Sequence, residues 1–178
     1  MEFSQRIFQK LATVITAYNL NIVEERSYYL KLQSNYIVIV FIHNELEGSS
    51  ALLLGGNNEK VHMVEIDNEV LKSFFDSDLK LSQVPVDAFI DNLVLFFGHE
   101  ASPLLKGDVS LIKKLEEFDS DRSKKYTHVL LERQNLTVAD KAWKNGDYKE
   151  FIKIIDQFNK DLLPSSYQMK YKIANRKI

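Results

Sequence analysis

Four histidines are the first residues to consider for chemistry, because an imidazole can bind a metal ion or transfer a proton near neutral pH. They are His43, His62, His99 and His128. His43 ends one apolar segment and His62 begins another, so neighbouring antiparallel strands could bring them together, and a zinc site with three histidines is conceivable. No pair has helical i, i+4 spacing, and no HExxH motif occurs. We therefore expect no metal and no cofactor.

Paired carboxylates occur in the segment Glu45-Leu46-Glu47, and two nearby acids are the groups that a hydrolase uses for acid–base catalysis. Acids in a loop are more often simply solvated. The sequence has no GxSxG serine motif and no glycine-rich phosphate-binding spacing. We expect a protein that is not an enzyme, with one alternative kept open: an enzyme or small-ligand site assembled from His43, Glu45 and His62.

The elements that would position these residues follow from the hydrophobic period. Apolar residues repeat every three to four positions over 3–18, which predicts an amphipathic helix. The run 36–42 is apolar without interruption, which predicts a strand covered on both faces. Further strands are predicted at 22–23, 28–32, 51–54 and 61–66. The short connections between these segments favour hairpins, and therefore an antiparallel meander of four to five strands.

After the meander the period returns to that of helices. Helices are predicted over 67–75, 85–97, 108–118 and 121–134, followed by a helical hairpin over 137–163 and a helix after Pro164. The predicted fold class is α+β, with an N-terminal helix, an antiparallel meander and a helical C-terminal half.

Charge divides the chain into two parts. Residues 1–100 contain 7 Lys and Arg against 14 Asp and Glu, whereas residues 101–178 contain 16 against 11, within a total net charge of −2. We expect a sheet domain over 1–100 and a helical extension over 101–178 that packs on it as one compact unit. An overall acidic chain of this kind is not expected to bind nucleic acid.

The absence of cysteine and of an apolar signal segment near Met1 favours a cytoplasmic protein. The longest apolar run falls well short of the roughly 20 residues that a membrane helix needs, so we expect no membrane association. The oligomeric state is left open by the sequence.

The segment from Thr137 to Pro164 includes Ala142-Trp143-Lys144-Asn145-Gly146-Asp147-Tyr148 and resembles a single tetratricopeptide repeat, in which Gly-Asp-Tyr marks the turn between two helices. Phe151 stands where the family has a small residue, and no second copy of the repeat follows. Since such arrays need about three units to be stable, we interpret it as a helical hairpin with Trp143, Tyr148, Phe151, Ile152 and Ile155 facing a core. A regulatory or scaffold module that binds through this hairpin, marked by exposed aromatic residues, is a second alternative.

The order of elements over residues 1–100 resembles that of small bacterial immunity proteins, which neutralise a secreted toxin domain. The resemblance implies a protein partner, such as a basic toxin domain, bound through an acidic surface. The acids that we assign to this surface are Glu24, Glu25, Glu45, Glu47, Glu59 and Glu65. Protein binding of this inhibitor kind is the function that the sequence favours.

Overall fold

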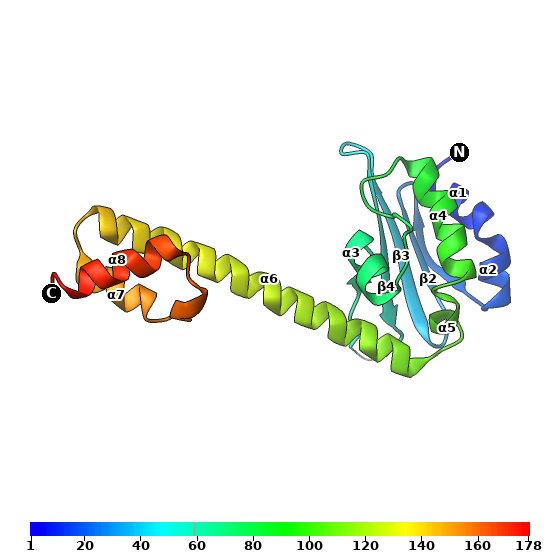
Figure 1. Ribbon diagram of the computed structural model, residues 1–178. Helices are drawn as coiled ribbons and strands as arrows, with labels where there is room; N and C mark the ends of the chain where they lie inside the picture. The colour runs from blue at the N-terminus through cyan, green and yellow to red at the C-terminus, as the bar shows by residue number, and fades with distance from the viewer. Residues whose placement is uncertain (59) are drawn as a thin grey trace. The chain divides into compact units, whose positions relative to one another are not determined.

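The computed structural model describes residues 1–58 and 60–178, which form two compact units, Met1–Ser120 and Asp121–Ile178 (Figure 1). The division falls twenty residues after the domain boundary expected at residue 100. Unit 1 contains the sheet and unit 2 is helical. The expectation that the helical part packs on the sheet domain stays a prediction.

The sheet of unit 1 is a five-stranded antiparallel meander, as predicted, with its strands in chain order. The strands are β1 (Asn21–Arg26), β2 (Tyr29–Gln33), β3 (Ile37–Asn44), β4 (Ser49–Gly56) and β5 (Val64–Glu65). β3 and β4 are paired along their full length, from Ile37 opposite Gly56 to Asn44 opposite Ser49. The α+β fold class is therefore confirmed.

Helices cover one face of this sheet. They are α1 (Phe3–Lys10), α2 (Ala12–Ala17), α3 (Asn68–Phe74), α4 (Val86–Gly98), α5 (Ser102–Leu105) and the start of α6 (Val109–Lys144). Figure 1 shows α1 and α4 beside one another against the sheet. Each of these helices contributes buried residues to one core with Ile39, Phe41, Leu52 and Leu54. The N-cap of α3 is Asp67, whose carboxylate accepts a hydrogen bond from the Val70 amide at 2.8 Å.

The helices pack on one face of the central strand, β3. In the described part of unit 1, its second face is covered by another segment of the chain rather than by a helix. Val38 lies opposite Gly55, and a Cβ at Gly55 would come within 2.4 Å of the His62 carbonyl oxygen. The segment through His62 therefore passes over this face. Val38 and Val40 are buried, whereas Ile42 is 37% exposed. The prediction of complete cover on both faces holds only for the first part of the strand.

Unit 2 consists of the C-terminal part of α6, α7 (Tyr148–Ile155), the 3₁₀ turn η1 (Lys160–Leu162) and α8 (Ser165–Asn175). Phe151 and Ile155 are fully buried in its core, and Trp143, Tyr148 and Ile152 pack against them, as the sequence predicts. Gly146, with φ of 73°, makes the turn between α6 and α7.

The predicted break between a helix that ends at residue 134 and a hairpin that begins at residue 137 is wrong. The hydroxyl of Thr137 donates to the Arg133 carbonyl at 2.9 Å, a bond made inside a helix, and α6 continues through this point. The chain has no Gly or Pro between residues 108 and 145 to end the helix.

No helix in the described part of the chain is both long enough and apolar enough to cross a membrane.

Candidate functional site

The end of the sheet nearest the β3–β4 turn contains three of the residues that the sequence singled out, His43, Glu45 and Glu47. His43 lies on β3 opposite Ser50 on β4, and Nδ1 of the imidazole is 2.9 Å from the serine Oγ. The imidazole stacks on Phe3 of α1, with ring centroids 5.2 Å apart. The centroid of the Tyr28 ring lies 6.0 Å from that of the imidazole, and the two planes are tilted by 48°. His43 is therefore held in place by a strand, a helix and a turn.

Glu45 is held by the same group of residues. The Tyr28 hydroxyl donates a hydrogen bond of 2.7 Å to Oε2 of Glu45. This hydrogen bond raises the pKa of Tyr28 above its ordinary value, because ionising the phenol would place two negative oxygens side by side. Tyr28, His43 and Glu45 line an open hollow of about 350 Å³. Sequence reasoning missed Tyr28, because its distance from Glu45 along the chain gives no sign of a contact that forms only when the strands pair.

A serine, a histidine and a nearby acid suggest hydrolysis, but the geometry lacks one contact. The Ser50–His43 hydrogen bond could pass a proton between the two side chains. In the described part of the chain, however, no carboxylate hydrogen-bonds to this imidazole, and Glu45 accepts its bond from Tyr28 instead. The arrangement therefore lacks the orienting acid of a catalytic triad.

His62 lies elsewhere, and the predicted approach of His43 and His62 is wrong. The His62 backbone packs against Gly55, opposite Val38, whereas His43 is five residues further along β3, about 17 Å away at the rise of a strand. Nε2 of His62 is 3.0 Å from Oδ2 of Asp119. Within residues 1–58 and 60–178 no cluster of three His, Asp or Glu side chains could hold a metal ion.

The turn between β3 and β4 presents an apolar side chain in a fixed conformation. Oδ1 of Asn44 accepts hydrogen bonds from the amides of Leu46 and Glu47, at 3.1 and 3.4 Å. Gly48 follows with φ of 62°, which closes the turn into β4. Leu46 is 99% exposed between Glu45 and Glu47. Sequence reasoning assigned Glu45 and Glu47 to a partner surface but did not single out Leu46, although an isolated leucine between two acids was visible.

The other acids assigned to a partner surface are not gathered there. Glu24 pairs with Arg26 at 2.6 Å on β1, and Glu25 is exposed on the same edge strand. Glu65 lies on β5, at the opposite edge of the sheet. Glu59 lies outside the described residues. The structure therefore places only Glu45 and Glu47 together, at the β3–β4 turn.

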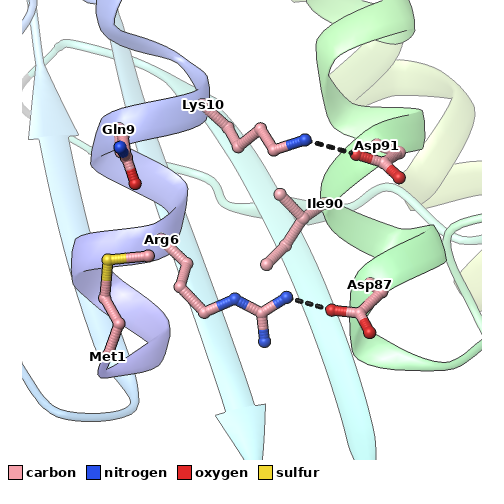
Figure 2. Close-up of a pocket in the computed structure, with 7 residues that line it drawn as sticks. All are labelled: Met1, Arg6, Gln9, Lys10, Asp87, Ile90 and Asp91. Atoms are coloured by element: carbon pink, nitrogen blue, oxygen red, sulfur yellow. Dashed lines mark hydrogen bonds and ion pairs between the residues drawn. The ribbon is translucent and has the colours of Figure 1, made fainter.

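A second hollow, of about 290 Å³, lies between α1 and α4 (Figure 2). Arg6 reaches across it to Asp87, and Lys10 reaches Asp91 at 2.9 Å. These charges satisfy one another at an exposed position, where each pair contributes at most about 1 kcal/mol. The groove is best explained as the seam between two helices.

Asp140 of α6 is the centre of a polar network in unit 2. It accepts hydrogen bonds from Lys170 at 2.8 Å and from Tyr167 at 2.7 Å, both on α8. The hydrogen bonds from Lys170 and then Tyr167 lower the pKa of Asp140. Burial, followed by the bond to Asp140, raises the pKa of Tyr167 to about 12. The network ties α8 to α6, which is a structural role.

The aromatic residues of the helical hairpin do not form an exposed patch. Trp143 packs edge-on against Tyr148 at 5.3 Å and against Phe151 at 5.3 Å. The sign expected for a scaffold that binds through exposed aromatic residues is therefore missing around Trp143. The exposed large apolar residues of the hairpin are Val138 and Leu162.

In the described part of the chain, the geometry offers the β3–β4 turn with its adjoining hollow as a candidate binding surface. Comparison of this chain with protein-family models, with curated proteins and with solved structures finds no match.

Proposed function

We propose that this chain is a non-catalytic protein-binding protein that neutralises a basic partner domain, as inhibitor and immunity proteins do, and that the β3–β4 turn is its contact point. The observation that carries the proposal is Leu46, which is 99% exposed in a turn fixed by Asn44 and Gly48. An apolar side chain costs free energy in water unless it is buried against another molecule.

The rigidity of the turn favours binding. A loop that already has its bound conformation loses little conformational entropy when it docks. The two amide hydrogen bonds to Asn44 fix the backbone on both sides of Leu46. An apolar centre with a polar rim is the usual arrangement of a protein–protein interface.

Charge indicates the kind of partner. Unit 1 contains 10 Lys and Arg against 18 Asp and Glu, a net charge of −8, whereas unit 2 contains 13 against 7, a net charge of +6. In the described part of the chain, neither Glu45 nor Glu47 forms an ion pair with a basic residue. A partner with a positive surface would approach this end of unit 1 faster and bind it more selectively.

The proposal is tested by affinity capture with the tagged full-length chain from an extract of its native cell. We expect the natural chain to retain one basic protein at physiological salt. The double variant Glu45→Lys/Glu47→Lys should lose it, because the rim charges then repel the partner. Leu46→Asp should lose it as well, since a carboxylate would have to be desolvated in the interface.

A matched control reverses two exposed acids of unit 2, Glu132→Lys/Asp161→Lys, with the same change in net charge. This control should retain the partner. Equal loss in both double variants would show that total charge, not the turn, determines binding. Retention by Leu46→Asp and by Glu45→Lys/Glu47→Lys would contradict the proposal.

A further inference from the structure

The hollow beside the turn has the form of a receptor for a long side chain. It is lined by Phe3, Val86 and Tyr28, which supply apolar and aromatic walls, and by Glu45 at its polar end. Its volume of about 350 Å³ is ample for one amino-acid side chain. The hollow lies beside Leu46, because Glu45 lines the hollow and directly precedes Leu46 in the turn.

The carboxylate of Glu45 is oriented before any ligand arrives. Tyr28 donates to Oε2 at 2.7 Å and so fixes the position of the group. A carboxylate has two oxygens and about four acceptor sites, so one hydrogen bond leaves most of its capacity available. A positively charged ligand that donates hydrogen bonds would fill the remaining acceptor sites of the Glu45 carboxylate.

The charged groups that already line the hollow are satisfied by other partners. The Arg6 guanidinium is bound to Asp87, in the groove between α1 and α4 (Figure 2). Glu2 is the N-cap residue of α1, where a negative charge offsets the positive end of the helix. Met1 also lines the hollow, and Glu45, which accepts one hydrogen bond from Tyr28, keeps acceptor capacity for a ligand.

The rings select the shape of the ligand. Phe3, His43 and Tyr28 all line the hollow, and the imidazole centroid lies 5.2 Å from that of Phe3 and 6.0 Å from that of Tyr28. A guanidinium is planar, stacks on aromatic rings and binds a carboxylate through two N–H groups. Its methylene stem would lie along Phe3 and Val86.

We propose that this hollow binds an arginine side chain presented by the protein partner. The inference rests on the proposed function, whose anchor is Leu46, and adds the chemical identity of the neighbouring contact. Lysine, which lacks the planar fork, should bind more weakly.

The test uses N-acetyl-arginine amide as the probe, added to the full-length chain and followed by NMR at the His43 and Tyr28 rings. We expect saturable shifts at both rings. The citrulline analogue, which has the same shape without the charge, should produce none at the same concentration. Glu45→Gln should weaken the arginine probe by about tenfold or more, as loss of a charge-assisted hydrogen bond does.

Glu47→Gln is the matched control, because Glu47 belongs to the same turn but does not line the hollow. It should leave the affinity for the probe unchanged. Equal shifts with arginine and citrulline, or equal effects of Glu45→Gln and Glu47→Gln, would overturn the inference. These outcomes are independent of partner capture: loss of capture in Leu46→Asp together with no response to arginine would reject the hollow and retain the proposed function.

Discussion

Gly55 shows how a single residue controls the path of the chain across the sheet. A Cβ at this position would lie 2.4 Å from the His62 carbonyl oxygen and 2.8 Å from the Met63 sulfur. Gly55 and Gly56 both belong to β4. Glycine is needed here because another backbone segment approaches closely, not because the chain turns.

Gly55→Ala should destabilise unit 1 by about 1–3 kcal/mol, since the neighbouring contact is with backbone and cannot yield easily. Gly98→Ala is the control, because nothing lies within 4 Å of its Cβ position at the end of α4. That change should be neutral or stabilising by up to about 1 kcal/mol. Hydrogen exchange of the β3 and β4 amides measures both effects, and equal protection in the two variants would contradict the close approach.

Tyr167 and Asp140 predict how unit 2 responds to pH. The unfolded chain releases a tyrosine proton near pH 10, whereas the folded pKa of Tyr167 is about 12, so the folded state binds more protons between these values. Stability should therefore fall as the pH rises through this window. The pKa of Asp140 is lowered, so its stabilisation is present above the ordinary carboxyl range and is lost as the pH falls below it.

Thermal unfolding followed by the emission wavelength of Trp143, the chain's single tryptophan, reports on unit 2 within the full-length protein. Tyr167→Phe should remove part of the alkaline loss of stability and should reduce, without abolishing, the acidic one, because Lys170 still hydrogen-bonds to Asp140. An identical alkaline profile in the variant and the natural chain would show that Tyr167 is not the titrating group.

At the level of elements, α6 differs most from the sequence prediction. Two helices and a capped hairpin were expected where one helix runs from Val109 to Lys144. Thr137 with an acid three residues later matches a capping-box pattern, but the same hydroxyl can also bond to a carbonyl inside a helix. Local sequence could not decide between the two, because the outcome depends on whether the preceding residues remain helical.

Two substitutions distinguish a cap from a helix interior by the sign of their effect. Thr137→Ala should stabilise unit 2 by a few tenths of a kcal/mol, and by no more than about 0.7 kcal/mol, because alanine has the higher helix propensity. Asp147→Ala should cost about 1 kcal/mol, since Asp147 caps α7 by accepting from the Glu150 amide at 3.0 Å. Urea unfolding followed by Trp143 fluorescence measures both changes in stability. A loss of about 1 kcal/mol in Thr137→Ala would show that Thr137 caps a helix after all.

Elements with strong local signals were predicted well. β3 follows from its uninterrupted apolar run, and the meander order follows from its short connections. The candidate site was predicted only in part. His43 and Glu45 were singled out. Tyr28 was missed, because it reaches Glu45 only once the strands pair. His62 lies away from the site, because its segment packs over Gly55. Contacts between distant residues depend on packing, which residue spacing does not encode.

For the molecule as a whole, the two units carry opposite net charge, −8 and +6. In the proposed complex, the negative charge of unit 1 accelerates approach, whereas Leu46 and the adjoining hollow hold the partner. Charge therefore affects mainly the association rate, and burial affects mainly the dissociation rate.

With the captured partner, Glu45→Lys/Glu47→Lys should slow association by about tenfold or more at low salt, with a smaller effect at high salt. Leu46→Ala should instead accelerate dissociation, with association nearly unchanged. Stopped-flow measurements at two ionic strengths separate these effects. Association rates that do not depend on salt would rule out electrostatic steering by unit 1.

The central claim is that the β3–β4 turn touches a partner protein, and site-specific photo-crosslinking in the native cell tests it most directly. A photoreactive residue is placed at Leu46 or, as a matched control, at Leu162, which is 82% exposed on η1 of unit 2. We predict one basic protein crosslinked from position 46, absent from position 162 and lost in the Glu47→Lys background. The same products from both positions, or none from position 46, would contradict the account.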